Sequence, residues 1–189
     1  KLIARTNEAL CTEQKYICVS RPRRFGKSMA ANMLAAYYDR SEHTNELFEN
    51  LKISKDQSYR ENLNRYDVIK INIQEFLSMT GTVEEMLEML KNYLISDFKE
   101  AYPKILLRDE KNLIQVMKDV FSYTKCPFVI LIDEWDCLFR EYKQDKEEQK
   151  MYLDFLRAWL KDKDYVALAY MTGILPIKKY GSHSTLNMF

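Results

Sequence analysis

The segment from residue 16 to residue 28 reads YICVSRPRRFGKS and constrains the fold more than any other part of the chain. Its apolar start, Lys15–Ser20, has the pattern of a buried strand, whereas Ser28–Asp39, rich in Ala, Met and Leu, has that of a helix. A basic turn that ends in the letters GKS joins the two. A turn between a strand and a helix N-terminus can wrap backbone N–H groups around an anion. The segment therefore predicts an α/β fold with a phosphate-binding turn.

The residue types in this turn suit a polyphosphate that carries Mg2+. Gly26 lets the backbone approach the phosphates, Lys27 supplies a positive charge for the β- and γ-phosphates, and the Ser28 hydroxyl can ligate the metal ion. Lys27 is therefore also a candidate catalytic residue. We expect nucleotide contacts from the whole run Arg21, Pro22, Arg23, Arg24, Phe25, Gly26, Lys27, Ser28 and Met29.

The turn departs from the usual phosphate-loop pattern at its first position. Arg21 stands where that pattern has a glycine, five residues before Gly26. Pro22, Arg23 and Arg24 make the loop stiffer and more cationic. Three interpretations stay open for Arg23 and Arg24: contact with phosphates, pairing with an acidic patch, or solvation. The alternative for the segment as a whole is an ordinary strand-to-helix connection with a basic surface.

A second motif ends a strand in two carboxylates. Residues 128–134 read FVILIDE, and the apolar part, Phe128–Ile132, is typical of a strand buried on both faces of a parallel sheet. Ligands of open α/β sheets bind at the carboxyl edge of the strands. We therefore expect Asp133 to hold Mg2+, directly or through water, and Glu134 to act as the base for an attacking water. The alternative is that the pair begins a polar turn continued by Asp136.

A third candidate catalytic residue follows the last predicted strand, Tyr165–Met171, which is broken by Thr172-Gly173. A hydroxyl at the tip of a strand beside the phosphate loop could sense the γ-phosphate or orient water. The alternative is that Thr172 closes a strand before a glycine turn.

The rest of the chain alternates between helices and strands. We predict an irregular segment at Thr44–Tyr66 with a short helix near Leu47–Leu51, a strand at Tyr66–Ile73, a helix from Gly81-Thr82, and helices over Glu110–Tyr123 and Lys146–Leu160. Thr82 and Glu85 form a capping-box pattern. This alternation indicates a single α/β domain over residues 1–189 with right-handed crossovers.

Composition and cysteine spacing narrow the class of protein. A hydrophobic fraction of 47% supports one substantial core, and a net charge of +1 excludes the global basic field of a dedicated nucleic-acid binder. No run is long enough to cross a bilayer. The four cysteines lack metal-ligand spacing: Cys18 is in a strand, and Cys11 and Cys137 belong to helical stretches. Small apolar side chains in a reducing cytosol are the expected interpretation, hence a cytoplasmic location.

At its motifs the sequence resembles the bacterial AAA-ATPase-like family. The resemblance rests on RPRRFGKS (Arg21–Ser28), LIDEWD (Leu131–Asp136), KDKDYVALAYMTGI (Lys161–Ile174) and the tail HSTLN (His183–Asn187). It implies a P-loop NTPase core of the additional-strand type, a three-layer sandwich whose mainly parallel sheet is flanked by helices. It also implies ATP and Mg2+ as ligands, with the phosphate and metal contacts named above. Trp135 and Leu138 replace the family's Tyr and Pro, which we expect to alter packing rather than chemistry.

The family is often joined to a C-terminal nuclease-like domain. Because the sequence starts at Lys1 and stops at Phe189, we interpret it as a piece of a longer chain. A fifth strand, a lid and any nuclease-like domain are expected beyond Phe189, and the piece alone is expected to hydrolyse ATP weakly. The process that ATP turnover drives, a protein or nucleic-acid partner and the oligomeric state stay open. No trans-acting arginine stands out among Arg108, Arg140 and Arg157.

Three functions are compatible with these motifs. The leading hypothesis is an ATPase in which Glu134 orients a water for attack on the γ-phosphate. The second is a nucleotide-dependent switch or interaction module with negligible turnover. The third, a P-loop kinase, is disfavoured because a carboxylate pair after a long apolar strand suits water activation. Adenine is favoured over guanine because the chain has no Asn-Lys-x-Asp element.

The phosphate-loop interpretation makes a direct prediction for Lys27. Lys27→Ala should remove most nucleotide binding, because only the flanking arginines could replace its charge over the phosphates. Titration with a fluorescent ATP analogue measures the affinity. Affinities of variant and parent within about a factor of two would contradict the role of Lys27 and would instead point to Arg23 or Arg24 as the dominant charge.

Overall fold

A sheet of four parallel strands forms the middle of the structure, a computed structural model that describes residues 1–176 and 188–189. The strands are β1 (Tyr16–Ser20), β2 (Asp67–Asn72), β3 (Phe128–Asp133) and β4 (Val166–Gly173), in the order β1-β4-β3-β2. Every neighbouring pair is parallel. β4 therefore lies between β1, which leads into the basic turn, and β3, which ends in the carboxylates. This order confirms the predicted additional-strand type of α/β fold.

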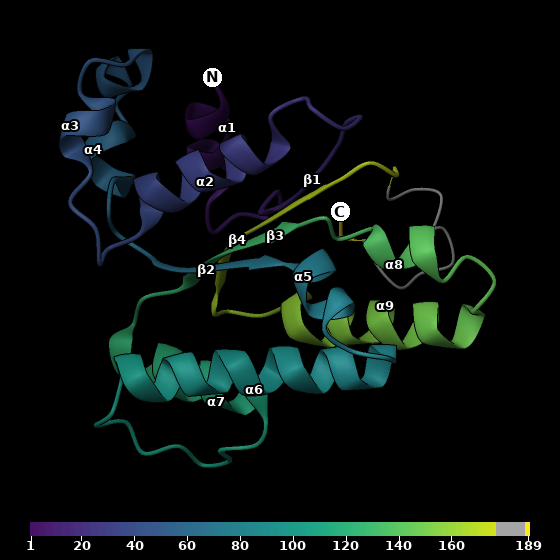
Figure 1. Cartoon of the computed structure of the whole chain (residues 1–189). Helices are drawn as coiled ribbons and strands as arrows, with labels where there is room; N and C mark the ends of the chain where they lie inside the picture. The colour runs from purple at the N-terminus through teal and green to yellow at the C-terminus, as the bar shows by residue number, and fades with distance from the viewer. Residues whose placement is uncertain (177–187) are drawn as a thin grey trace.

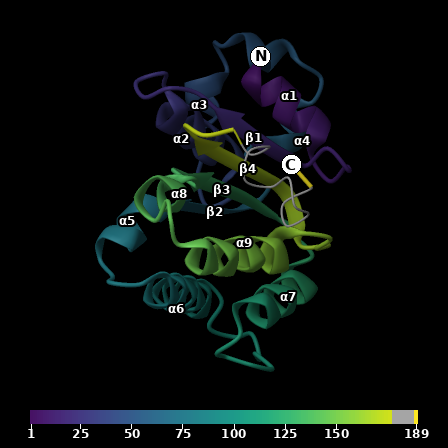
Figure 2. The ribbon, with the colours of Figure 1, turned by 90° about the vertical axis from the view of Figure 1, so that its right-hand side faces the viewer.

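Helices cover both faces of the sheet (Figure 1, Figure 2). α1 to α4 lie on one face and α6, α7 and α9 on the other, which confirms the three-layer sandwich; α5 and α8 lie at the carboxyl ends of the strands. Their bounds are α1 (Leu2–Ala9), α2 (Lys27–Tyr38), α3 (Asn45–Phe48), the 3-10 helix η1 (Lys52–Lys55), α4 (Tyr59–Asn62), α5 (Ile73–Ser78), α6 (Val83–Ala101), α7 (Leu113–Thr124), α8 (Cys137–Glu141) and α9 (Lys146–Leu160).

The central strand β3 is buried along its whole length and separates two apolar cores. Phe128, Ile130 and Ile132 belong to the core with α6, α7 and α9. Val129 and Leu131 belong to the core with α1 and α2. Successive side chains of a strand point to opposite faces, so a continuous apolar run is what a strand between two helical layers requires. The expectation drawn from FVILI is confirmed.

Local capping signals set the starts of two long helices. The Thr82 hydroxyl accepts from the backbone N–H of Glu85 (3.2 Å), and the Glu85 carboxylate accepts from the N–H of Thr82 (3.2 Å), so the predicted capping box of α6 is present. The Asp145 side chain accepts from the N–H of Glu148 (3.0 Å) at the start of α9. Each cap satisfies a donor that the first helical turn leaves unpaired.

Two predicted boundaries are wrong because a polar side chain caps a helix at a residue that the apolar pattern did not indicate. α7 begins at Leu113 rather than Glu110, since Asn112 accepts from the N–H of Gln115 (3.2 Å). β2 ends at Asn72, whose side chain accepts from the N–H of Gln74 (3.0 Å) and starts α5, a helix that was not predicted.

Other segments also differ from the sequence-based expectations. β4 runs through Thr172 and Gly173 instead of breaking there. Cys11 lies in an exposed turn with a φ of 57° rather than in a helix, whereas Cys137 begins α8 as expected. Residues 44–66 form α3, η1 and α4, because buried Phe48 and Tyr59 pack against α2. The tail His183–Asn187 lies outside the described residues.

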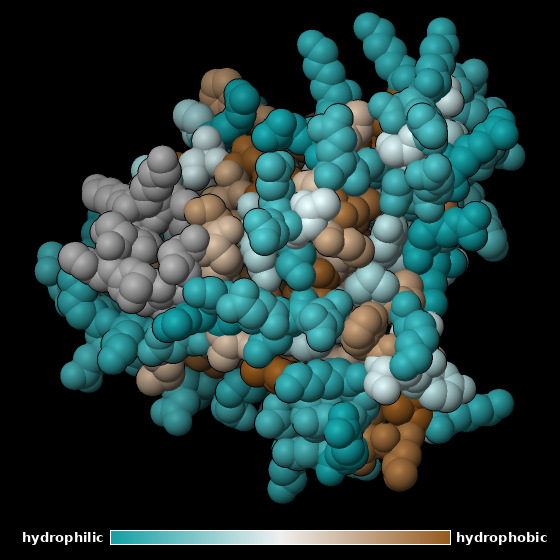
Figure 3. All heavy atoms as spheres, turned by 180° about the vertical axis from the view of Figure 1, so that it is seen from behind, coloured by the Kyte–Doolittle hydropathy of each residue, from teal (hydrophilic) through white to brown (hydrophobic). Residues whose placement is uncertain are grey.

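Hydrophilic side chains cover most of the face seen in Figure 3, and apolar atoms are exposed there only in separate areas. Within residues 1–176, no helix combines the length and the apolar character needed to span a bilayer.

Gly173, the last residue of β4, is packed too tightly to carry a side chain. A Cβ atom at this position would lie 2.6 Å from Asp136 Oδ1 and 2.7 Å from Trp135 Nε1. Both of these side chains are completely buried behind the end of β3. The glycine therefore lets the end of β4 lie directly against the segment that follows β3.

Gly173→Ala should destabilise the fold by about 1–3 kcal/mol, the usual cost of overpacking a core. For a domain of this size, the melting temperature should fall by roughly 2–12 °C in a thermal scan. Gly81→Ala is the matched control, since its Cβ would meet only the flexible Glu85 carboxylate at 3.4 Å. Equal melting temperatures for the two variants would contradict the close packing at Gly173.

Candidate functional site

The basic turn between β1 and α2 has a fixed backbone. The N–H of Arg21 donates to the carbonyl of Gly173 (3.0 Å), which ties the start of the turn to the end of β4. Arg24 and Gly26 both have left-handed φ angles, 67° and 70°. Gly26 adopts this conformation without the penalty that a side chain brings. The chain thus turns sharply twice before α2 begins at Lys27.

The N-terminus of α2 has no capping side chain, unlike the starts of α5, α6, α7 and α9. Gly26 occupies the N-cap position, and the first turn of α2 contains no acidic residue. The first N–H groups of α2 therefore lie at the positive end of the helix dipole, and no side chain among the described residues caps them. This is the local structure that binds phosphate in α/β proteins.

Lys27 is the one buried side chain of the turn, with 8% of its surface exposed. Its ammonium donates to the carbonyls of Arg21 (3.0 Å) and Pro22 (3.1 Å). An ammonium has three donor hydrogens, so one is left for a further acceptor. The two carbonyls hold the charge inside the curve of the turn, and this is the contribution that Arg21 and Pro22 make.

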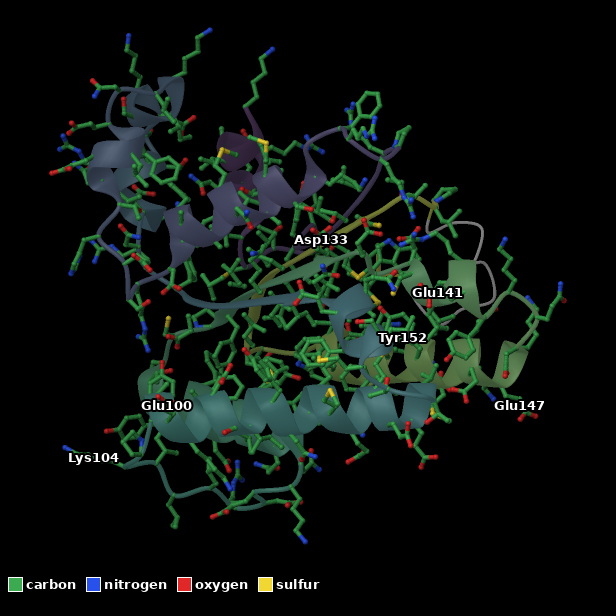
Figure 4. All side chains as sticks on the ribbon, in the orientation of Figure 1. Glu100, Lys104, Asp133, Glu141, Glu147 and Tyr152 are labelled. Atoms are coloured by element: carbon green, nitrogen blue, oxygen red, sulfur yellow. The ribbon has the colours of Figure 1, made fainter. Side chains whose placement is uncertain are left out.

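Asp133, at the end of β3, joins three segments that are far apart in the sequence. Its carboxylate accepts from the hydroxyl of Ser28 (2.5 Å), from the hydroxyl of Thr172 and from the N–H of Glu134 (3.0 Å). Only 4% of the residue is exposed. Figure 4 shows Asp133 where its strand ends, near the start of α2. The two sequence motifs therefore meet at this carboxylate.

Thr172 lies at the carboxyl edge of the sheet, but its side chain is buried. Its hydroxyl donates to Asp133 and does not line the neighbouring cleft. A direct role in sensing phosphate stays a prediction; the contact in the structure is with the carboxylate that Ser28 also contacts.

Glu134 forms an ion pair with Arg140 of α8. Its backbone has a φ of 53°, a left-handed conformation that a non-glycine residue adopts at a cost. Sequence reasoning did not place Arg140 at this site. The available signal was the spacing of Asp136 and Arg140, opposite charges four residues apart beside a helical stretch; their closest atoms, Arg140 Nε and Asp136 Oδ2, are 3.7 Å apart.

Buried groups behind the acidic pair hold it in place. Asp136 is completely buried and accepts from the backbone N–H groups of Ile174 (2.9 Å) and Leu175 (2.7 Å). Tyr152, labelled in Figure 4, reaches from α9 and donates to the carbonyl of Trp135 (2.8 Å). Burial raises the pKa of the nearby Cys18 thiol to about 12, so this side chain is a neutral, apolar group at neutral pH.

A cleft of about 640 Å³ opens at this edge of the sheet. Among the predicted site residues, those that line it are Arg23, Arg24, Gly26, Lys27, Ser28, Met29 and Glu134. Arg140, Asn72, Gln74 and Glu141 line it as well and were not predicted. Phe25 does not line the cleft, and its side chain is 62% exposed.

Among the described residues, Arg23 and Arg24 form no ion pair, so neither of them pairs with an acidic patch.

The oxygen atoms at this edge suit Mg2+ when a phosphate completes the coordination. A hydroxyl and a carboxylate, from Ser28 and Asp133, already lie in contact. Both are hard oxygen donors of the kind that Mg2+ prefers. Nowhere in residues 1–176 or 188–189 do three or more His, Cys, Asp or Glu side chains gather as a metal cage. The arrangement therefore fits a cation that arrives with a nucleotide and takes few ligands from the protein.

Comparison with known proteins agrees with this geometry. A search of curated proteins finds no match to the chain. A family model described as predicted AAA-ATPase matches residues 5–182, a range that includes the basic turn, all four strands and the acidic pair. With the strand order and the turn between β1 and α2, this match shows that the chain belongs to the predicted AAA-ATPase family.

Proposed function

We propose that this chain binds Mg-ATP in the cleft beside α2 and hydrolyses the bond to the γ-phosphate. The observation that carries the proposal is the contact between Ser28 and Asp133, with Oγ and Oδ2 2.5 Å apart. It joins the phosphate-loop motif to the acidic strand end, which lie 105 residues apart in the sequence. In P-loop NTPases, a hydroxyl from the phosphate loop and a carboxylate from a strand end together hold the cation of a bound nucleotide.

The turn would bind the phosphates through three kinds of contact. The unpaired N–H groups at the start of α2 would donate to phosphate oxygens, and Lys27 would add a positive charge held by the carbonyls of Arg21 and Pro22. Arg23 and Arg24 line the same cleft and raise its positive potential. Because the backbone is already turned, little ordering of the chain is needed when the nucleotide binds.

Ser28 and Asp133 would hold the cation, which would neutralise part of the negative charge of the phosphates. Thr172 would keep the Asp133 carboxylate oriented, since its hydroxyl donates to one of the two oxygens while Ser28 contacts the other. A carboxylate held by three donors at a buried strand end has little freedom to turn away from the site.

Glu134 would accept the proton of the attacking water. It lines the cleft, and it follows the residue that holds the cation. A carboxylate contributes to such a step by orienting the water and taking its proton as the bond to phosphorus forms. For this, Glu134 must exchange its ion pair with Arg140 for a contact with water.

A nucleotide-dependent switch with negligible turnover is the second candidate, and the Glu134–Arg140 pair favours it. A carboxylate that keeps a guanidinium partner is not free to hold a water molecule for attack. Steady-state phosphate release decides between the two: release that Glu134→Gln abolishes supports the ATPase, whereas equal, negligible release by both proteins supports the switch.

The nucleobase that we propose for the ligand is adenine. The location that we propose is the cytoplasm, where the four free thiols stay reduced.

The two carboxylates should give different phenotypes. Asp133→Asn should weaken Mg2+-dependent ATP binding about 10–100-fold, because the cation loses a charged group in its coordination or water shell. Glu134→Gln should leave binding largely intact and lower turnover by about 100-fold or more, because it removes the base and keeps the shape. Calorimetry with and without Mg2+ gives the affinities, and phosphate release gives the turnover.

Glu147→Gln is the matched control, since this exposed residue at the start of α9 lies far from Asp133 in Figure 4. It should change neither quantity. If Asp133→Asn and Glu134→Gln alter binding and turnover alike, the proposed division of roles is wrong.

A further inference from the structure

Arg140 has more hydrogen-bonding capacity than its contacts use. Its Nη2 donates to Glu134, but its buried Nε has no hydrogen-bond partner in the part of the chain that the structure describes, and Asp136 Oδ2 lies 3.7 Å from it. A guanidinium has five donor hydrogens in a fixed planar fork, which matches two oxygens of a carboxylate or phosphate. Only 19% of the side chain is exposed. Such a group, near a cleft, is placed to receive an anion.

The position of Arg140 relates it to the phosphate loop. It lines the same cleft as Lys27 and Ser28, although it belongs to α8, which follows the acidic strand end. The completely buried Asp136 lies close to its Nε and limits how far the guanidinium can move into solvent. A phosphate group bound between α2 and Glu134 would therefore come within the reach of this side chain.

Glu134 and a γ-phosphate are competitors for this guanidinium. The carboxylate carries one negative charge, whereas a terminal phosphate carries more charge and three acceptor oxygens, so it is the stronger partner for arginine. The exchange would also release the carboxylate to contact water. ADP lacks the terminal phosphate and would leave the ion pair as it is.

We propose that Arg140 is a γ-phosphate contact supplied by the same chain, held by Glu134 until ATP binds. The proposal rests on the proposed function of the cleft. In this proposal Arg140 distinguishes ATP from ADP. When the γ-phosphate binds to Arg140, the carboxylate of Glu134 is freed to contact water. It also gives the site an arginine without a second subunit.

The test must separate contact with phosphate from simple neutralisation of Glu134. Removing Arg140 alone leaves an unpaired carboxylate that repels the γ-phosphate, so it would weaken ATP binding under either explanation. The comparison is therefore made in the Glu134→Gln background, where this charge is absent. The two proteins are Glu134→Gln and the double variant Glu134→Gln/Arg140→Met, each titrated with Mg2+ plus ADP or a non-hydrolysable ATP analogue in a calorimeter.

We expect Arg140→Met in this background to lower the preference for the ATP analogue over ADP by about tenfold, the value of one charge-assisted hydrogen bond. Affinity for ADP should change by less than about twofold. Arg157→Met in the same background is the control, since this exposed arginine of α9 does not line the cleft and should keep the preference.

Melting temperatures show whether the double variant is folded. If it is not, Arg140→Lys takes its place, because lysine keeps the charge beside Asp136 but loses the planar fork, and a drop of about threefold in the preference is expected. An unchanged preference with nucleotide binding intact would overturn the assignment of Arg140 and leave the proposed function standing. A parent protein that binds neither nucleotide would overturn the proposed function, and the assignment of Arg140 with it.

Discussion

The buried carboxylate of Asp133 is the constraint on which the rest of the structure depends. A charge with 4% exposure is tolerated only where hydrogen bonds replace the lost water. Ser28, Thr172 and the N–H of Glu134 supply them, from α2, β4 and the chain after β3. Those donors converge because β4 lies between β1 and β3 and all strands are parallel. The order of the strands therefore determines which residues can meet at Asp133.

The two apolar cores explain why the chemistry is confined to one edge. β3 and β4 are buried along their whole length between the two helical layers, so their faces are unavailable to a polar ligand. Polar groups collect where parallel strands end, and there the helix dipole of α2 adds positive potential. Because Gly173 packs tightly on Trp135 and Asp136, the end of β4 lies directly against the segment that carries Glu134.

What could be predicted from the sequence was local. The turn ending in Gly26-Lys27-Ser28, the run FVILI and the Thr82–Glu85 cap each lie within a few residues, and the strand order came with the family resemblance. Contacts made by folding could not be predicted in the same way. Arg140 meets Glu134 only because the chain turns sharply between β3 and α8, and Asn72 caps α5 after a strand whose apolar pattern runs on into Ile73. Side-chain hydrogen bonds that compete with a strand or helix pattern leave little trace in apolar periodicity.

Three polar side chains at this edge already contact oxygen atoms of the protein. Lys27 is held by carbonyl oxygens, Ser28 by a carboxylate oxygen and Arg140 by the carboxylate of Glu134. A phosphate oxygen is the same kind of acceptor as each of these. Lys27 and Arg140 are already largely removed from water, so most of the cost of desolvating their charges is met on folding, before a phosphate binds. The start of α2 is the exception: its N–H groups have no capping side chain, and it is there that an anion would add contacts without displacing any.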